Sequence, residues 1–282
     1  MTLNEKIKNL KISWAGILMY YFLPYRRKII FANIDQVFGN KLTTRQKKQL
    51  AQAFYAHLAC SIKEAVAIRF MSTEKLRQAV EVKNAEIVLK VAAQKRGVLI
   101  LTGHFGNWEF APIGGILNFK QFQGQFHFIR RTIGNKTLER ILFKRYYQAG
   151  LNVIRKKNSL PQICDVLAQN HATVFVLDQH ASLVNRDGIA VEFFGKKAGT
   201  YRSLASIARY TGLPVIPAAG YRLLNGRHVL EFYEPIAWRN YDNTHDSIYK
   251  NTLAYNQALE HIILEHPEQW LWLHKRWKLT EK

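Results

Sequence analysis

The stretch VLILTGHFGNWEFAPIGGIL, residues 98–117, reads as a β-strand, a tight turn and a helix. A continuous apolar run opens it, glycines at 103 and 106 allow a sharp turn, and Asn107 is a residue type that caps helices. A strand that leads into a helix is the repeating unit of α/β sheets. The stretch therefore predicts an α/β fold in which the turn lies at the carboxyl end of a strand, where open sheets of this kind bind their ligands.

The alternation of strand and helix patterns continues beyond this stretch. Helical patterns cover residues 136–149, 160–169, 201–210 and 246–264. Between them lie short β-rich runs: FHFIR (126–130), LNVI (151–154), TVFVL (173–177), VEFF (191–194), PVIPA (214–218) and VLEFY (229–233). We predict a central mixed β-sheet flanked by helices, with an N-terminal helical part at residues 1–83 and an α/β catalytic body at 84–282 that together form one continuous domain.

The N-terminal segment has two interpretations. Three lysines precede the run ISWAGILMYYFL, as in a secretory signal, but no small-residue cleavage site follows, so we do not expect the segment to be one. The apolar run from Ile12 to Tyr25 is about 14 residues long, roughly 21 Å as a helix, which falls short of a ~30 Å hydrocarbon core. Helical spacing relates the apolar residues Leu3, Ile7, Leu10, Trp14, Ile17 and Tyr21. The pattern is typical of a helix that lies in a membrane interface, and equally of a helix docked on the protein's own core.

The composition restricts the class of partner. Lys and Arg number 41 against 20 Asp and Glu, a net charge of +21, which attracts nucleic acid, anionic lipid or an acidic carrier protein. Cys60 and Cys164 are the two cysteines and form no CxxC pair, so neither a disulfide framework nor a zinc ribbon is indicated. The default setting is reducing and cytosolic.

The turn at residues 103–109 is a candidate catalytic site. His104 lies between two glycines, and Glu109 in the first turn of the following helix can fold back toward the ring. A carboxylate at one ring nitrogen would fix the tautomer and leave the other nitrogen free to accept a proton, as in an oriented general base. No G-x-S-x-G elbow occurs, so we expect this base to activate a hydroxyl of the substrate. The alternative is a turn histidine followed by an ordinary helix-capping carboxylate.

No metal or cofactor motif accompanies this turn. Asp178 and His180 could form a metal pair, but no third ligand at familiar spacing is present. HExxH, Walker A and dinucleotide-binding glycine patterns are also absent from the sequence. We therefore predict neither a metal nor a bound cofactor.

Several segments resemble the bacterial lipid A biosynthesis acyltransferases, the lauroyl/myristoyl transferase family within the broader lysophospholipid acyltransferase group. The matching segments are GHFGNWE (103–109), VEFFGKKAGTYRSLASIARYTGLPVIP (191–217), PEQWLWLHKRWK (267–278) and, more weakly, YRRKIIFANIDQVFG (25–39). The resemblance implies a glycerolipid acyltransferase-like fold. It also implies that His104 is the base and Glu109 its partner.

Six further residues are candidates for substrate binding. They are Gly106, Asn107, Arg130, Arg131, Arg145 and Asp178. Asp178 matches an aspartate that follows the central strand of the family, and Arg130 or Arg131 matches a strand-end arginine. Arg145 is carried over although the register is off by one and Tyr146 occupies the nearest position. An arginine near the site, or the turn amides around Gly106, would offset charge that develops on the substrate oxygen.

The activity that the resemblance implies is transfer of a fatty acyl chain to a hydroxyl of an anionic membrane glycolipid, such as a lipid A precursor. The donor would be acyl carrier protein (ACP) or a coenzyme A (CoA) thioester, and the place the cytoplasmic face of the bacterial inner membrane. Another glycolipid, an aminolipid or a lysophospholipid stays open as acceptor. A basic nucleic-acid-binding protein is the alternative from another class, but the chain has no helix-turn-helix or RNP-type signature and its charge is dispersed, so we expect no nucleic-acid partner.

Overall fold

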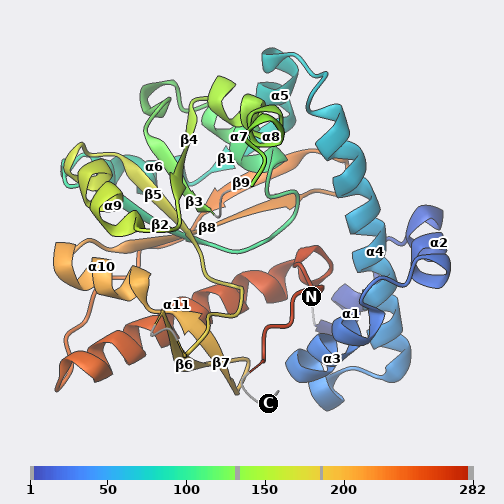
Figure 1. Ribbon diagram of the computed structural model, residues 1–282. Helices are drawn as coiled ribbons and strands as arrows, with labels where there is room; N and C mark the ends of the chain where they lie inside the picture. The colour runs from blue at the N-terminus through green and yellow to red at the C-terminus, as the bar shows by residue number, and fades with distance from the viewer. Residues whose placement is uncertain (1–2, 131–133, 185–186, 279–282) are drawn as a thin grey trace.

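The computed structural model describes residues 3–130, 134–184 and 187–278 of the chain. A mixed sheet forms its centre, with helices on both faces, which confirms the predicted fold class (Figure 1). The strands are β1 (Val80–Lys83), β2 (Val98–Thr102), β3 (Phe126–Arg130), β4 (Leu151–Arg155), β5 (Ala172–Val176), β6 (Gly188–Phe193), β7 (Lys196–Tyr201), β8 (Val215–Arg222) and β9 (His228–Phe232). Among the described residues, seven of them form one sheet in the order β1-β9-β8-β2-β5-β3-β4, and β6 and β7 form a separate antiparallel pair.

Strand β2 occupies the middle of the large sheet, which explains its uninterrupted apolar run. It pairs in parallel with β5 on one side and β8 on the other. Strand β3 is parallel to β5 and β4, and β1 is parallel to β9. The antiparallel pair is β8 and β9, which a short connection joins into a hairpin, and this pair makes the sheet mixed.

The helices divide between the two faces of the sheet. Their bounds are α1 (Leu3–Lys8), α2 (Trp14–Phe22), α3 (Arg27–Phe38), α4 (Thr44–Ala67), α5 (Thr73–Ala79), α6 (Ala85–Ala92), α7 (Phe110–Ile116), α8 (Lys136–Gln148), α9 (Ser159–Ala168), α10 (Ser203–Thr211) and α11 (Thr244–Glu265), with short 3-10 turns η1 (Gly39–Lys41), η2 (Lys120–Phe122) and η3 (Pro267–Gln269). Val98 and Ile100 of β2 point into the core under α5 to α8, whereas Leu99 and Leu101 point into the core shared with α9 to α11 and the N-terminal helices.

Helix α4 attaches the N-terminal helices to the body. Thr43 and Gln46 cap it reciprocally. Its buried positions include Leu50, Phe54, His57 and Ser61, a helical spacing that turns one face toward the sheet edge. One hydrophobic cluster includes residues of both the N-terminal helices and the sheet. Residues 80–83, just before the predicted boundary at 84, form β1 and therefore belong to the sheet.

The N-terminal apolar stripe is divided between two helices, not continuous along one. Ser13 caps α2 by accepting from the Gly16 N–H, and this break separates α2 from α1. Ile7 of α1 is fully buried in the core, whereas Trp14 and Phe22 of α2 are 75% and 76% exposed. Tyr20 packs against Tyr55 of α4, with ring centroids 5.9 Å apart.

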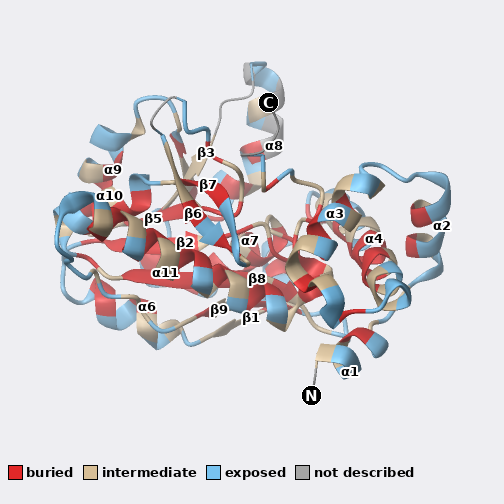
Figure 2. Ribbon diagram, turned by 90° about the horizontal axis from the view of Figure 1, so that it is seen from below, coloured by how far each residue is buried: buried red, intermediate tan, exposed pale blue. Residues whose placement is uncertain are grey.

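Helix α2 therefore docks on α4 with one face and leaves an apolar face exposed at the edge of the molecule (Figure 2). The close approach of the two helices requires Gly16, because a Cβ there would lie 2.4 Å from that of Ala56. Among the described residues, the helices are either too short or too polar to cross a membrane.

Candidate active site

A cavity of about 640 Å³ lies at the carboxyl edge of the large sheet. Residues that follow three parallel strands of this sheet line it: His104 after β2, Gln179 after β5 and Lys156 after β4. This is the edge at which the sequence predicted a site, because carboxyl ends of parallel strands meet at one side of a sheet.

Asp178 holds His104 at two points. One carboxylate oxygen, Oδ2, accepts from the His104 backbone N–H at 2.8 Å, and the other, Oδ1, lies 2.9 Å from the ring Nδ1. The Trp270 indole also donates to Oδ2, at 3.0 Å. Burial alone would raise the pKa of Asp178, but the His104 ring and these hydrogen bonds outweigh it and hold that pKa at about 2.

This contact determines the tautomer of the neutral ring. An ionised carboxylate only accepts hydrogen bonds, so Nδ1 carries the proton and Nε2 carries the lone pair. Burial opposes the charged form of His104, but the neighbouring Asp178 charge more than compensates and raises the ring's pKa above its ordinary value. The imidazole is therefore an oriented base with 21% of its side chain exposed.

The ring's carboxylate partner is Asp178, whereas the sequence predicted Glu109. The physical reason is strand order: β5 lies beside β2, with Thr102 opposite Val176, so the residue two positions beyond Val176 meets the turn. Glu109 instead lines the cavity at the start of α7. Burial raises the pKa of Glu109, and the nearby Arg130 and Arg69 oppose that rise.

Two further side chains contact the His104 ring, and the sequence analysis did not identify either. The Gln179 amide nitrogen lies 3.3 Å from Nε2, and the Trp108 ring meets the imidazole edge-on at 5.4 Å. Both residues line the cavity. Gln179 follows Asp178 directly and Trp108 lies within the turn motif, so their positions beside the predicted residues were the available signal.

The inner part of the cavity is apolar. One row of side chains crosses the α7 and α8 side of the sheet on four adjacent strands. It consists of Ile100 of β2, Val174 of β5, Phe128 of β3 and Val153 of β4. The aromatic residues that continue this lining are Phe119, Phe126, Tyr146 and Phe232. A pit with these walls can take up an alkyl chain.

Basic side chains predominate at the rim of the cavity, beside the acidic Glu109 and Asp187. Arg130, Lys156 and Arg202 line it, and the Arg130 guanidinium lies 3.6 Å from the centre of the Phe143 ring. Lys156 donates to the Tyr201 hydroxyl at 2.6 Å. Burial lowers the pKa of Arg130, although Tyr146 and Glu109 partly offset this effect.

The two other predicted arginines have different outcomes. Arg131 lies outside the described residues. Arg145 is not among the residues that line the cavity, and its guanidinium donates to the Arg69 and Met71 carbonyls at 2.9 and 2.6 Å. It therefore braces the chain that follows α4, while its neighbour Tyr146 takes the position on the cavity wall.

Gly106 and Asn107 shape the turn. Gly106 has a φ of +53°, and a Cβ there would lie 2.4 Å from the Gly220 carbonyl oxygen, so the position requires glycine. Its N–H, which was predicted to help offset substrate charge, donates to the Gln269 carbonyl at 2.9 Å. Asn107 is buried and accepts from the Phe110 N–H at 3.1 Å, which supports its predicted capping role.

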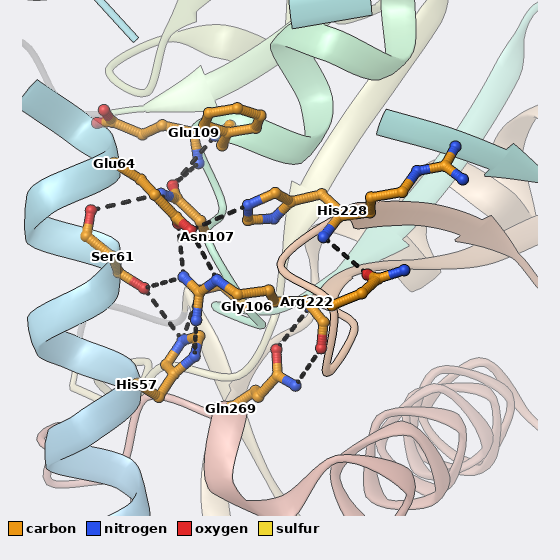
Figure 3. A network of polar contacts seen from close by, with 12 residues as sticks. His57, Ser61, Glu64, Gly106, Asn107, Glu109, Arg222, His228 and Gln269 are labelled. Carbon is orange, nitrogen blue, oxygen red and sulfur yellow. Dashed lines mark hydrogen bonds and ion pairs between the residues drawn. The ribbon is translucent and has the colours of Figure 1, made fainter. Parts of the chain in front are cut away.

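Behind the turn lies a polar network that does not line the cavity (Figure 3). Its centre is the ion pair between Glu64 of α4 and Arg222 of β8, with Nη2 and Oε2 2.5 Å apart. His57, Asn107 and His228 contact this pair. Burial would raise the pKa of Glu64, but the hydrogen bonds from His228 and Arg222 prevail and lower it to about 2. The sequence analysis identified neither member of the pair.

Within residues 3–130, 134–184 and 187–278, no three His, Cys, Asp or Glu side chains gather as a set of metal ligands. Cys60 and Cys164 are free thiols.

Comparison with known proteins identifies relatives along nearly the whole chain. Residues 3–279 match the family model described as bacterial lipid A biosynthesis acyltransferase. The lipid A biosynthesis lauroyltransferase of Escherichia coli (strain K12) is 24% identical over 268 residues, covering 93% of this chain and 82% of the relative. The lipid A biosynthesis palmitoleoyltransferase of the same organism is 25% identical over 273 residues with the same coverage.

A solved structure also matches. It is the crystal structure of the 1-acyl-sn-glycerophosphate acyltransferase PlsC from Thermotoga maritima, with 18% identity and a TM-score of 0.38. The match covers 92% of this chain and 98% of that one.

Proposed function

Because the chain belongs to the bacterial lipid A biosynthesis acyltransferase family, we propose that it moves a fatty acyl chain from an ACP or CoA thioester to a hydroxyl of a membrane glycolipid such as a lipid A precursor. The observation that carries this proposal is the position of the His104–Asp178 pair at the mouth of an apolar cavity with a basic rim. This arrangement combines a base that can deprotonate a hydroxyl, an apolar cavity that can take up an alkyl chain and cations that can bind phosphate groups.

The reaction begins with proton transfer to His104. His104 Nε2 takes the proton from the glycolipid hydroxyl while the hydroxyl oxygen attacks the carbonyl carbon of the thioester. Asp178 stabilises the imidazolium that forms. The C–O bond forms, and the carbonyl oxygen of the tetrahedral intermediate becomes negative. Collapse of this intermediate breaks the C–S bond, and the imidazolium returns its proton to the leaving thiolate. Arg130 on the cavity wall is the cation suited to offset the oxyanion.

The two substrates occupy different parts of the cavity in this proposal. The acyl chain enters the apolar pit along the row that contains Ile100 and Val174. The basic rim formed by Arg130, Lys156 and Arg202 attracts the phosphates of the glycolipid and of the donor's phosphopantetheine arm. Thioester and hydroxyl then meet beside Nε2.

The proposed place of action is the cytoplasmic face of the inner membrane, with peripheral attachment through the N-terminal helices. The exposed face of α2, with Trp14 and Phe22 at its two ends, supports this position, as does the net charge of +21. Aromatic and aliphatic side chains next to lysines are suited to the headgroup region of an anionic membrane.

The test is acyl transfer from acyl-ACP and acyl-CoA to a lipid A precursor by the wild type and by His104→Ala. Loss of the base is expected to lower the rate ~10²- to 10⁴-fold. His245→Ala is the matched control, because that imidazole is 78% exposed on α11. Near-normal turnover by a folded His104→Ala variant would reject the assignment, and mass spectrometry of the lipid product identifies the acceptor.

A further inference from the structure

The Glu64–Arg222 ion pair joins two elements that contribute no group to the reaction. The Arg222 guanidinium holds Glu64 with two parallel contacts, Nε to Oε1 at 2.7 Å and Nη2 to Oε2 at 2.5 Å. The side chains are only 13% and 19% exposed. We infer that this pair is the positioning device of the catalytic turn and sets the geometry of His104 through His57 and Asn107. The inference rests on the acyl-transfer function proposed above.

The first link runs through His57. Arg222 Nη1 lies 2.9 Å from His57 Nδ1, and a guanidinium has no lone pair to offer, so Nδ1 is the acceptor. The ring proton is therefore on Nε2, which donates to the Gly106 carbonyl at 3.1 Å. Burial and the neighbouring Arg222 lower the pKa of His57 to about 4, so the ring stays neutral at physiological pH. Arg222 thus selects the tautomer that holds the turn.

The second link runs through Asn107. Its Nδ2 donates to Glu64 Oε2 at 2.9 Å, which orients the amide because a carboxylate only accepts. Its Oδ1 then accepts from the Glu109 and Phe110 N–H groups at 3.2 and 3.1 Å. Glu64 therefore fixes the point at which the turn enters α7.

The third link is the backbone of Arg222. Its N–H and carbonyl pair with the Gln269 side chain at 2.8 and 2.9 Å. The Gln269 carbonyl accepts from the Gly106 N–H, and the Leu271 N–H donates to the His104 carbonyl at 3.1 Å. Residues 104–107 are thus held from α4, from β8 and from the segment around Gln269, while none of these three links touches the imidazole.

This arrangement is suited to positioning because its parts are rigid. A bidentate arginine–carboxylate pair fixes distance and orientation together, and a displacement of about 1 Å in a catalytic group can cost ~10²-fold in rate. Any shift of the turn moves His104 relative to Asp178, which holds both its backbone N–H and its ring. Loosening the network is therefore expected to weaken that contact.

The deciding comparison is His57→Leu against His57→Gln. Leucine removes the hydrogen bond to Gly106 without leaving a charge unpaired, because Arg222 keeps Glu64. We expect kcat to fall roughly 10- to 100-fold and KM for the acyl thioester to change less than about threefold, since the cavity wall is untouched. Glutamine can accept from Arg222 and donate to Gly106, so it is expected to restore most of kcat.

A second readout follows the His104 ring directly. In ¹⁵N-histidine NMR titrations, a weaker Asp178 contact lowers the pKa of His104, because Asp178 is what raises it. The other titratable or charged side chains that line this cavity or interact with His104 are unchanged in the variant: Glu109, Arg130, Tyr146, Lys156, Asp187, Tyr201, Arg202 and His274. A purely structural role would lower Tm and leave this pKa in place. The titration needs no turnover, so an inactive wild type would reject the proposed function without deciding the positioning role.

Two more variants complete the test. Arg222→Lys keeps the charge but loses the paired geometry, and it is expected to act in the same direction as His57→Leu should the latter fold poorly. Tyr233→Phe removes a partly buried hydrogen bond, 2.8 Å long, from the residue after β9 to Glu265 at the end of α11, and is expected to keep wild-type kcat. Wild-type kcat and an unshifted His104 pKa in His57→Leu would overturn the inference, as would an equal loss of kcat in Tyr233→Phe.

Discussion

At the scale of single residues, the carboxylate that contacts the His104 imidazole is separated from it in sequence and adjacent to it in space. Asp178 reaches both the backbone and the ring of His104, while Glu109, five positions along the chain, faces the cavity. Each carboxylate therefore has its own place, one behind the ring and one on the substrate side. Their substitutions should have different kinetic consequences.

We predict that Asp178→Asn lowers kcat by roughly 10³-fold, because an amide N–H at Nδ1 favours the tautomer whose Nε2 carries the proton. Glu109→Gln is expected to cost less than about tenfold in kcat and to act mainly on KM. Steady-state kinetics of both variants with one acyl thioester measure the contrast. A larger loss of kcat in Glu109→Gln than in Asp178→Asn would show that Glu109, not Asp178, is the partner of the His104 ring.

At the scale of elements, α2 and α4 show how one helix can have two surroundings. Helix α2 places Tyr20 against α4 and leaves Trp14 and Phe22 exposed. Ile7 of α1 is fully buried, so removing the whole N-terminal segment would expose core and confuse binding with folding. Point substitutions on the outer face of α2 are therefore the proper test of membrane attachment.

We predict that Trp14→Ala combined with Phe22→Ala reduces sedimentation with anionic vesicles by roughly tenfold, because both side chains would leave the headgroup region. Tyr210→Ala is the control, since Tyr210 is 83% exposed on α10, far from α2 (Figure 1). Equal vesicle binding by the double variant and the wild type would exclude α2 as the docking element.

The row of side chains across β2, β5, β3 and β4 leads to a prediction about substrate length. Val153→Phe adds bulk to the pit wall, so we expect the preference in kcat/KM to move toward shorter acyl chains by roughly tenfold. A series of acyl thioesters of increasing length measures this preference. Val153→Ile is the conservative control, and an unchanged chain-length profile in Val153→Phe would place the acyl chain elsewhere.

Local patterns predicted the elements well, and tertiary neighbours explain what they missed. The run at 98–102 is a central strand, and His104 and Asp178 were both identified as candidates. Their pairing depends on β5 lying beside β2, which no local pattern encodes. Glu64 and Arg222 gave no signal at all, because a single charge on a helix or a strand resembles any solvated side chain until the fold buries the two together.

At the scale of the whole molecule, several histidines are kept neutral by the fold. Burial lowers the pKa of His57, His127, His266 and His274 to about 4, compared with an ordinary value of 6.5. Between these two values the unfolded chain binds protons that the folded protein does not. Stability therefore rises with pH across this window.

We predict that the free energy of unfolding falls as the pH drops from 6.5 to 4. It is expected to fall further below pH 4.5, because Glu64 takes up a proton there in the unfolded chain, whereas its pKa in the folded protein is about 2. Urea denaturation at pH 7 and pH 4.5 measures the loss. His127→Phe removes one titrating ring outside the site and should make the dependence shallower. A constant free energy across this range would contradict the prediction.

The segment around Gln269 and Leu271, which is hydrogen-bonded to the His104 turn, has a consequence for folding during synthesis. During translation the ribosome synthesises β2, His104 and Asp178 long before this segment, so a nascent chain has the imidazole and its carboxylate without the contacts that hold the backbone of the turn. The His104 turn therefore acquires its full set of hydrogen bonds only late in synthesis.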